Sequence, residues 1–223
     1  MILCIIQARL GSTRLPGKVL MPLGERTALG NVIHRVQKCR LVDAIVVACP
    51  YGDKEIIQET INCGAQYFTG DEHNVLERYY KAAKFFNADK IIRITADCPY
   101  IMPDLIDRLI EEVSHSAYGS NTIKRTYPKG LDCEIFPRSQ LCWAYQSTHT
   151  EYDIEHVTPY MKRVALKASC EYSMIDNEDY SHIRLTLDTQ EDYTQLTRLY
   201  KDIGSVYNYS ELKEYLRGLD NGW

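Results

Sequence analysis

The first eighteen residues read MILCIIQARLGSTRLPGK (Met1–Lys18) and join a short apolar run to a polar segment that contains glycine. Ile2–Ile6 is continuously apolar, which is typical of a strand covered on both faces of a sheet. The next segment, Gln7–Lys18, places three cations among Gly, Ser and Thr. Glycine lets backbone N–H groups turn toward an anion, and the hydroxyls supply further donors. The stretch therefore predicts a buried strand followed by a phosphate-binding loop.

The three cations of this loop are Arg9, Arg14 and Lys18, and their positive charge suits phosphate oxygens. The loop matches neither the Walker A pattern nor G-x-G-x-x-G, so the nucleotide folds with those motifs are not indicated. A solvated basic turn is the alternative interpretation of the same residues.

Strand and helix patterns alternate through the first half of the chain. The apolar residues between Ala28 and Val36 have helical spacing and predict an amphipathic helix. The patterns that follow are a strand at Ala44–Cys49, a helix from Asp53 to near Gly64, a strand at Gln66–Thr69, a helix at Val75–Phe86, a strand at Lys90–Thr95 and a helix opened by Pro103. This order predicts an α/β fold with a mostly parallel sheet flanked by helices. Because ligands of such sheets lie outside the carboxyl ends of the strands, we expect Gln7–Lys18 and Ala96–Met102 to border the site.

The second half of the chain is less regular. Its patterns predict a β-ribbon from segments 120–126 and 131–136, helices at Ser139–Tyr145 and Tyr152–Lys162, strands at Leu166–Met174 and Ile183–Leu187, a helix begun by Thr189 with Asp192 in a capping box, and a last helix with Leu212, Tyr215, Leu216 and Leu219 on one face. No linker or repeat interrupts the sequence, so we expect one domain over residues 1–223, with a ribbon around 118–136 that protrudes.

The composition narrows the class of protein. The 223 residues are 45% hydrophobic and 25% charged, a composition that is ordinary for a globular protein. The net charge of −4 disfavours a duplex-DNA partner, because proteins that bind DNA through its phosphates are usually basic. No apolar run approaches the roughly 18 residues that span a bilayer, and no export signal precedes the first strand. The eight cysteines form no C-x-x-C pair, which argues against structural zinc. We therefore expect a cytoplasmic protein with reduced thiols and with no nucleic-acid or membrane partner.

Six blocks along the chain, in order, resemble one enzyme family. The blocks are QARLGSTRLPGK (7–18), NVLERY (74–79), RITADCP (93–99), GLDCEIF (130–136), EHVTPY (155–160) and LTLDTQED (185–192). Together they resemble the cytidylyltransferases that activate acidic sugars, the acylneuraminate and 3-deoxy-octulosonate enzymes, and within these the SpsF-type branch of spore-coat polysaccharide biosynthesis.

The resemblance implies a fold, a reaction and partners. It implies a Rossmann-like, GT-A-like nucleotidyltransferase sheet that carries a small dimerisation ribbon. The implied enzyme transfers CMP from CTP to a hydroxyl or phosphate of an acidic sugar or related acceptor and releases pyrophosphate, for surface polysaccharide biosynthesis. CTP is then the co-substrate, Mg²⁺ the cofactor and an anionic sugar-like molecule the acceptor, in a homodimer built through ribbon 118–136.

The resemblance also assigns roles to residues. The implied catalytic residues are Arg9, Arg14, Lys18 and Asp97. The implied nucleotide-binding residues are Gln7, Ala8, Arg9, Gly11, Ser12, Lys18, Asn74, Arg78, Thr95 and Ala96. The implied metal ligands are Asp97 and Asp188, which follow two strands far apart in the sequence and converge only if the sheet brings those strand ends together. From the residues alone, Asp97 is equally a turn former. The structural alternative is stronger at Asp188, because Asp188 or Thr189 could simply cap the following helix.

Three further residues are candidates for binding the acceptor. Asp132 and Glu134 alternate on an expected strand and so share one face. His156 has the chemistry of an acid–base group, although a structural histidine is the commoner reading of such a position. The cations that suit an anionic acceptor are Arg93, Lys124, Arg125, Lys129 and Arg184, and the sequence does not choose among them.

The sequence departs from the family pattern at three positions. Ala96 stands where glycine is usual, Tyr100 where an aliphatic residue is usual, and Ile154 where an arginine is common. The missing arginine leaves the acceptor open and does not affect the CTP half of the reaction. Two other classes of protein stay open. One is a different enzyme, either a nucleotide-sugar-dependent glycosyltransferase or a nucleotidyltransferase that uses another NTP. The other is a non-catalytic nucleotide-binding protein. The sequence lacks the D-x-D motif that the glycosyltransferases typically carry.

Overall fold

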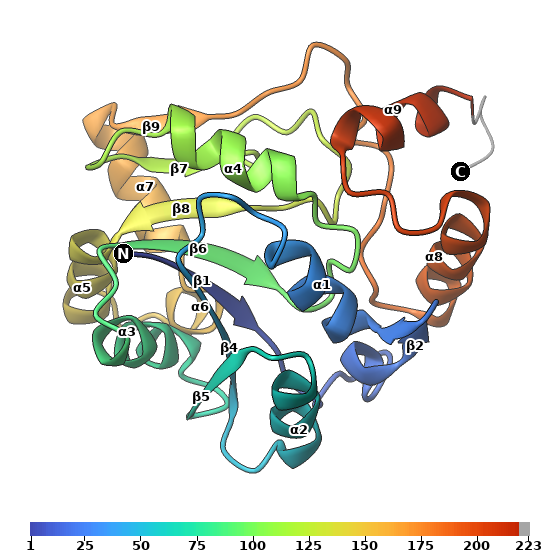
Figure 1. Ribbon diagram of the computed structural model, residues 1–223. Helices are drawn as coiled ribbons and strands as arrows, with labels where there is room; N and C mark the ends of the chain where they lie inside the picture. The colour runs from blue at the N-terminus through green and yellow to red at the C-terminus, as the bar shows by residue number, and fades with distance from the viewer. Residues whose placement is uncertain (219–223) are drawn as a thin grey trace.

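A seven-stranded sheet forms the centre of the computed structural model, which describes residues 1–218 (Figure 1). Its strand order is β5 (Gln66–Gly70), β4 (Ala44–Pro50), β1 (Ile2–Gln7), β6 (Lys90–Thr95), β8 (Glu134–Pro137), β7 (Tyr118–Ser120) and β9 (Glu171–Ser173). Neighbouring strands run parallel except at β8, which is antiparallel to both β6 and β7. The mostly parallel α/β fold predicted from the sequence is thus confirmed.

Strand β1 lies between β4 and β6, and this position explains its continuous apolar run. Gln7 is in register with Ala48 of β4 and Thr95 of β6, so these strand ends lie side by side. The side chains of Leu3 and Ile5 pack into one apolar cluster, and those of Cys4 and Ile6 pack into another on the opposite face. A strand buried on both faces needs apolar residues at every position.

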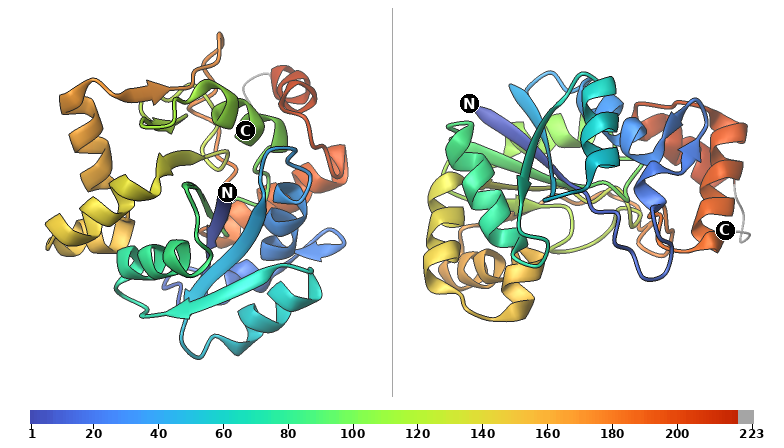
Figure 2. Two further views of the ribbon diagram at one scale, coloured as in Figure 1. Left: turned by 60° about the vertical axis from the view of Figure 1, so that its left-hand side comes forward. Right: turned by 90° about the horizontal axis from the view of Figure 1, so that it is seen from below.

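Helices cover both faces of the sheet, as Figure 2 shows from two further directions. One apolar cluster packs against α1 (Ala28–Val36), α2 (Lys54–Asn62), α4 (Pro103–Glu112), α8 (Gln190–Ile203) and α9 (Tyr209–Arg217). The other cluster packs against α3 (Val75–Phe85), α5 (Arg138–Ser147) and α7 (Pro159–Ala168). The short helix α6 (Glu151–His156), the 3₁₀ helix η1 (Lys18–Leu20) and the hairpin of β2 (Pro22–Leu23) and β3 (Arg26–Thr27) complete the described elements.

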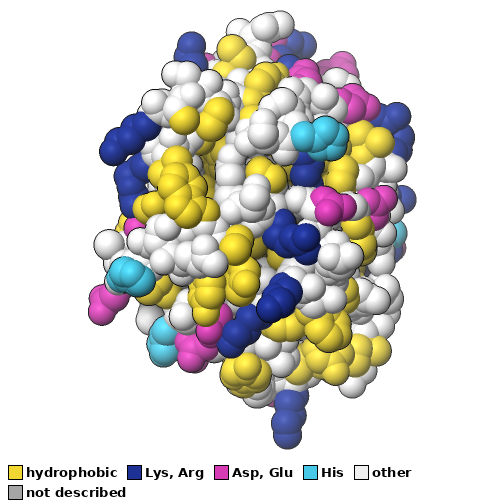
Figure 3. Space-filling view, turned by 90° about the vertical axis from the view of Figure 1, so that its left-hand side faces the viewer, with side chains coloured by type: hydrophobic (Ala, Val, Ile, Leu, Met, Phe, Trp, Pro, Cys, Tyr) yellow, Lys and Arg dark blue, Asp and Glu magenta, His cyan; other side chains and the backbone are white. Residues whose placement is uncertain are grey.

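The first-half predictions are confirmed to within one or two residues, and one predicted cap in the second half is confirmed as well. Thr189 and Asp192 form the expected capping box at α8. Leu212 and Leu216 of the last helix are buried, while Leu219 lies outside the described residues. Large apolar side chains also remain on the surface, among them Phe85, which is 73% exposed, and Trp143, which is 48% exposed. The surface in Figure 3 shows hydrophobic side chains interspersed with Lys and Arg.

Several second-half predictions were wrong. The two ribbon strands, β7 and β8, are shorter than expected and lie inside the sheet between β6 and β9. The helix expected at Tyr152–Lys162 is broken at Val157, whose φ is 70°, just before Thr158 and Pro159. The strand expected at Leu166–Met174 begins as the end of α7 and is extended only at β9.

The segment Ile183–Leu187 is extended but belongs to no strand of the sheet. The Lys129 N–H donates to Ile183 O at 2.9 Å, and the Leu185 N–H donates back to Lys129 O at 2.6 Å. The Leu187 N–H then donates to Asp97 O at 2.8 Å. Through this last bond the backbone places Asp188 next to the loop that follows β6.

No helix within residues 1–218 has the length and apolar character needed to cross a bilayer. All eight cysteines lie in this part of the chain, and each is a free thiol.

We predict that Gly130→Ala detaches the segment that precedes Asp188. Gly130 has φ 101°, and a Cβ there would lie 2.5 Å from the Leu185 carbonyl carbon. A positive φ and a backbone clash together should cost about 3 kcal/mol of folding stability. Chemical denaturation measures this loss. The matched control is Gly52→Ala, which also has positive φ (95°) but meets no atom within 4 Å, so it should cost less. Equal losses in the two variants would contradict the prediction.

A second prediction concerns Asp153, the carboxylate that joins α6 to α7. Its side chain is 1% exposed, accepts hydrogen bonds from Thr148 and Thr150, and pairs with Arg163 through both guanidinium Nη atoms, at 3.0 and 2.8 Å. The Arg163 pair lowers the pKa of Asp153 to about 2. We expect Asp153→Ala to cost about 2 kcal/mol at pH 7, because its donors lose their acceptor.

This contribution has a defined pH dependence. The folded-state pKa of Asp153 lies below the unfolded value of about 4, so its stabilisation is complete above pH 4 and disappears as the pH falls toward 2. Urea denaturation at pH 7 and at pH 3 measures the difference in free energy of unfolding between the wild type and Asp153→Ala. This difference, the stability gap, should be smaller at pH 3. Glu25→Ala, at a side chain that is 84% exposed, is the control and should show no such gap. A gap that stays constant with pH contradicts the assignment.

Candidate active site at the carboxyl edge of the sheet

The loop after β1 and the loop after β6 enclose a cavity of about 360 Å³. Ten of the residues singled out from the sequence line it: Gln7, Ala8, Arg9, Ser12, Arg14, Lys18, Thr95, Ala96, Asp97 and Asp188. Thr13 and Val19, which the sequence analysis did not single out, line it too. Asp97, which follows β6, and Asp188, which follows a segment outside the sheet, therefore converge, as the metal-site interpretation required.

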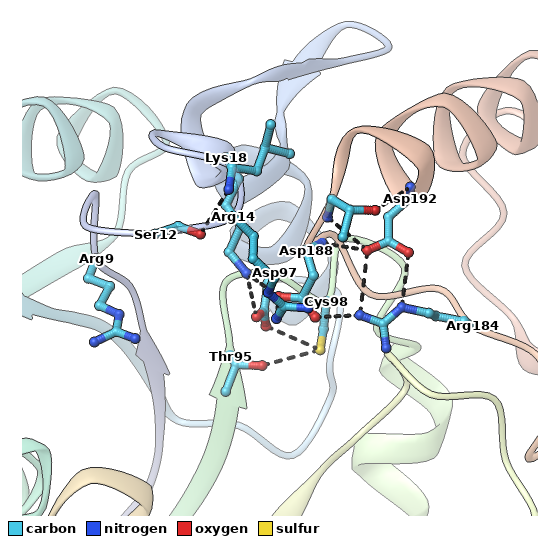
Figure 4. Close-up of polar contacts among 12 residues, drawn as sticks. Arg9, Ser12, Arg14, Lys18, Thr95, Asp97, Cys98, Arg184, Asp188 and Asp192 are labelled. Carbon is cyan, nitrogen blue, oxygen red and sulfur yellow. Dashed lines mark hydrogen bonds and ion pairs between the residues drawn. The ribbon is translucent and has the colours of Figure 1, made fainter.

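The conformation of the first loop directs Lys18 back toward the sheet. The Gly17 N–H donates to Leu10 O at 3.1 Å and closes the loop. Gly17 itself has φ 69°, a left-handed conformation that glycine adopts without strain, and η1 begins directly after it. The side chain of Lys18 is consequently 11% exposed and points into the cavity, as Figure 4 shows.

Lys18 bridges the two carboxylates. Its Nζ lies 2.9 Å from Oδ2 of Asp97 and 2.7 Å from Oδ1 of Asp188. Two arginines also contact Asp188: the Arg14 Nη2 lies 3.0 Å from its Oδ1, and Arg184 pairs with its other oxygen (Figure 4). Opposite charges within hydrogen-bond distance stabilise one another strongly where solvent is partly excluded.

The protonation states follow from these contacts. Burial by itself would lower the pKa of Lys18, but the charges and hydrogen bonds of Asp97 and Asp188 raise it above its usual value. Burial would raise the pKa of Asp188, but Lys18, Arg14 and Arg184 lower it below its usual value. At neutral pH the site therefore holds the charged ammonium of Lys18 against the charged carboxylate of Asp188.

The donor set suits a hard divalent cation. Asp97 and Asp188 offer carboxylate oxygens on either side of one cationic position, and Lys18 Nζ already stands there. Within residues 1–218, no three His, Cys, Asp or Glu side chains are grouped so that they could hold a metal ion. Two carboxylates with remaining ligands from phosphate and water are the usual environment of Mg²⁺ in nucleotide enzymes.

A second cavity, of about 320 Å³, meets the first at Thr95. Its lining includes Arg93, Arg125, Asp132, Glu134 and Lys162. The Arg125 guanidinium donates to both oxygens of Asp132, at 2.6 and 2.7 Å. The Lys162 Nζ, in contrast, makes no ion pair or hydrogen bond within the described residues, and it is a cation that the sequence analysis missed.

Glu134 belongs to the framework of this cavity. It is 6% exposed, pairs with Arg93 at 2.6 Å, and also accepts hydrogen bonds from Tyr118 and Thr158. Its acceptor sites are thus occupied by neighbouring strands and by the start of α7. Of the two acids expected on one face, Asp132 is the more accessible, with a side chain that is 35% exposed.

A third cavity, of about 460 Å³, meets the first at Arg9. Its carboxylates are Asp71, Glu72, Glu77, Glu151 and Glu155. Asn74 also lines this cavity and caps α3 by accepting from the Glu77 N–H at 3.0 Å.

Arg78 lies directly behind this cavity. It is 1% exposed, and its Nη1 donates to Asp71 O at 2.7 Å. Its Nε and Nη2 have no hydrogen-bond partner among residues 1–218. Two unpaired donors on a buried guanidinium are costly, and they favour a ligand that supplies acceptors.

The remaining sequence candidates lie outside these three cavities. Gly11 is exposed, and His156 is exposed at the end of α6, where its ring contacts Tyr152 with 4.6 Å between centroids. Lys124 and Lys129 are exposed as well, and Arg184 holds Asp188 and Asp192. One signal for the missed Lys162 was its place two residues after the block 155–160, on the helix that this block begins.

Several known proteins are similar to this chain in sequence. A family model described as Cytidylyltransferase matches residues 3–218. Spore coat polysaccharide biosynthesis protein SpsF of Bacillus subtilis (strain 168) is 35% identical over 213 residues, which cover 91% of this chain and 88% of that protein. A 3-deoxy-manno-octulosonate cytidylyltransferase of Pelobacter propionicus is 31% identical over 112 residues, which cover 49% of this chain and 43% of that protein.

A solved structure gives the same result in three dimensions. A cytidylyltransferase from Leptospira borgpetersenii serovar Hardjo-bovis is 30% identical and has a TM-score of 0.91, over 97% of this chain and 94% of that chain. The match extends over nearly the whole chain. The chain belongs to the cytidylyltransferase family and is a CTP-dependent nucleotidyltransferase.

Proposed function

We propose that this enzyme transfers CMP from CTP to a hydroxyl of an acidic sugar and releases pyrophosphate, for the synthesis of a surface polysaccharide. The observation that carries the proposal is the continuity of the three cavities along one sheet edge, with the paired carboxylates in the central one. In this reaction the acceptor oxygen forms a bond to the α-phosphorus, the bond from that phosphorus to the bridging oxygen breaks, and the hydroxyl proton leaves to solvent.

The central cavity accounts for the triphosphate. Arg9, Arg14 and Lys18 direct positive charge into it, and Ser12 adds a hydroxyl donor. Because negative charge accumulates on the departing pyrophosphate, fixed cations around it stabilise the transition state more than the ground state. Gln7, Ala8, Thr95 and Ala96 form the strand-end floor on which the nucleotide rests.

Asp97 and Asp188 would hold Mg²⁺ in this cavity. When bound, the metal ion offsets the charge of the phosphates and lowers the pKa of the attacking hydroxyl. The two carboxylates are already held in place by Lys18 and, at Asp188, by Arg14 and Arg184.

The acidic third cavity accounts for selection of cytosine. The 4-amino group of cytosine is a donor, which suits carboxylate acceptors, whereas uracil presents a carbonyl acceptor at the same position. The Nε and Nη2 of Arg78, which have no partner among the described residues, are donors close to a residue of this cavity, and O2 and N3 of cytosine are acceptors. Asn74 and Arg78 thus keep the nucleotide-binding role proposed for them from the sequence.

The second cavity accounts for an anionic acceptor. Lys162 supplies an unpaired positive charge, and the Arg125–Asp132 pair supplies a fixed donor and acceptor for sugar hydroxyls. The relatives support this class of substrate, because one of them is a 3-deoxy-manno-octulosonate cytidylyltransferase by name and another is a protein of polysaccharide biosynthesis. The proposal includes a homodimer in the cytoplasm, where CTP is made.

The CTP half is tested by thermal unfolding with CTP, UTP, ATP, GTP and dTTP, each with and without Mg²⁺. A ligand that binds the native state raises the melting temperature, so we expect a selective, Mg²⁺-dependent rise with CTP.

Asp97→Asn should keep the melting temperature of the free protein and lower the rate of pyrophosphate release by about 10²-fold or more. Asp179→Asn, at an exposed surface carboxylate, is the control. Near-wild-type turnover in Asp97→Asn contradicts the assignment.

The acceptor half is tested at Lys162. We expect Lys162→Ala to raise the KM for an acidic acceptor, with 3-deoxy-manno-octulosonate as the first probe, by about tenfold, because one charge-assisted hydrogen bond is lost. The KM for CTP should not change. Lys167→Ala, an exposed lysine on the same helix, is the matched control. Equal effects on both KM values, or a neutral sugar used as readily, would argue against this cavity as the acceptor site.

A further inference from the structure

The two carboxylates of the central cavity, Asp97 and Asp188, are bridged by the same ammonium group. Lys18 Nζ contacts Asp97 and Asp188 at 2.9 and 2.7 Å, and each distance is that of a charge-assisted hydrogen bond. These carboxylates are 28% and 17% exposed, so the pair is partly shielded from water. A divalent cation ligated by Oδ2 of Asp97 and Oδ1 of Asp188 would compete with Nζ for the same two oxygens.

The surrounding charges are balanced without a metal ion. Lys18, Arg14 and Arg184 supply three positive charges, and Asp97, Asp188 and Asp192 supply three negative charges. A divalent cation that entered this arrangement alone would meet no excess negative charge and would be repelled by Lys18 at close range. The described part of the chain also offers it only two carboxylates, which leaves most of its coordination to water.

We propose that Lys18 occupies the divalent-cation position in the nucleotide-free enzyme and so prevents tight metal binding until a triphosphate is present. A bound triphosphate offers Nζ new anionic partners in the same cavity, and its negative charge compensates the metal ion. The backbone need not move, because Gly17 and η1 fix the Lys18 Cα while the long side chain rotates. Metal and nucleotide then strengthen each other's binding by the same factor, as linkage requires. This inference rests on the proposed function for the identity of the nucleotide.

The experiment measures Mn²⁺ binding to the nucleotide-free protein, with the paramagnetic resonance signal of free Mn²⁺ as the readout. We expect Lys18→Met to bind Mn²⁺ about tenfold more tightly than the wild type, because the competing charge is gone. Lys18→Arg keeps the charge and should bind as weakly as the wild type. Lys201→Met makes the same substitution at an exposed position of α8 and should leave the affinity unchanged.

A double variant locates the gained site. Asp97→Asn introduced into Lys18→Met should remove the added affinity, since one of the two carboxylate ligands is lost. Circular dichroism melts confirm that each variant is folded, and Lys18→Gln replaces Lys18→Met if the latter is not. The inference is overturned if the uncharged variant binds Mn²⁺ no more tightly than the wild type, or if Lys18→Arg gains as much. No nucleotide is present, so this result is independent of whether CTP is the substrate.

Discussion

The rest of this site depends on one interaction, in which a single ammonium group, that of Lys18, pairs with two carboxylates. Asp97 and Asp188 repel each other, and bringing them together requires a cation between them. Lys18 is that cation in the structure, and its place is determined by the turn at Gly17 and by the burial of η1. A metal ion would meet the same electrostatic demand, and the ammonium group of Lys18 in turn suits a polyphosphate. The ion pairs and the proposed chemistry therefore have one physical origin.

The sheet brings these groups to a common point. β1 and β6 end side by side at Gln7 and Thr95, so the loops after them border a single cavity. The third component, Asp188, comes from a segment outside the sheet that is held by backbone bonds to Lys129 and Asp97. The cavities on either side share Arg9 and Thr95 with the central one, and nucleobase, phosphates and acceptor can therefore lie along one edge.

Much of this architecture was predictable because its signals are local. The apolar run of β1, the helical spacing of α1 and the capping residues of α8 each depend on neighbours within a few residues. The second half was harder to predict because its strands lack such local signals. β7, β8 and β9 are three or four residues long and are stabilised by partners far away in sequence, so their own pattern is weak. A helix pattern at residues 152–162 also concealed the break at Val157, which the backbone alone reveals.

The sequence by itself determined the fold class, the family and the first loop as a phosphate-binding candidate, because these depend on local periodicity and on the order of short blocks. Only the tertiary structure decided which charged groups meet. Lys18 reaches Asp97 across 79 residues and Asp188 across 170 residues, and no local pattern encodes contacts of that range. The structure likewise separated Lys162, which lines one of the three cavities, from His156, which lines none of them. Side-chain direction depends on how distant elements pack, and that packing is a property of the folded chain as a whole.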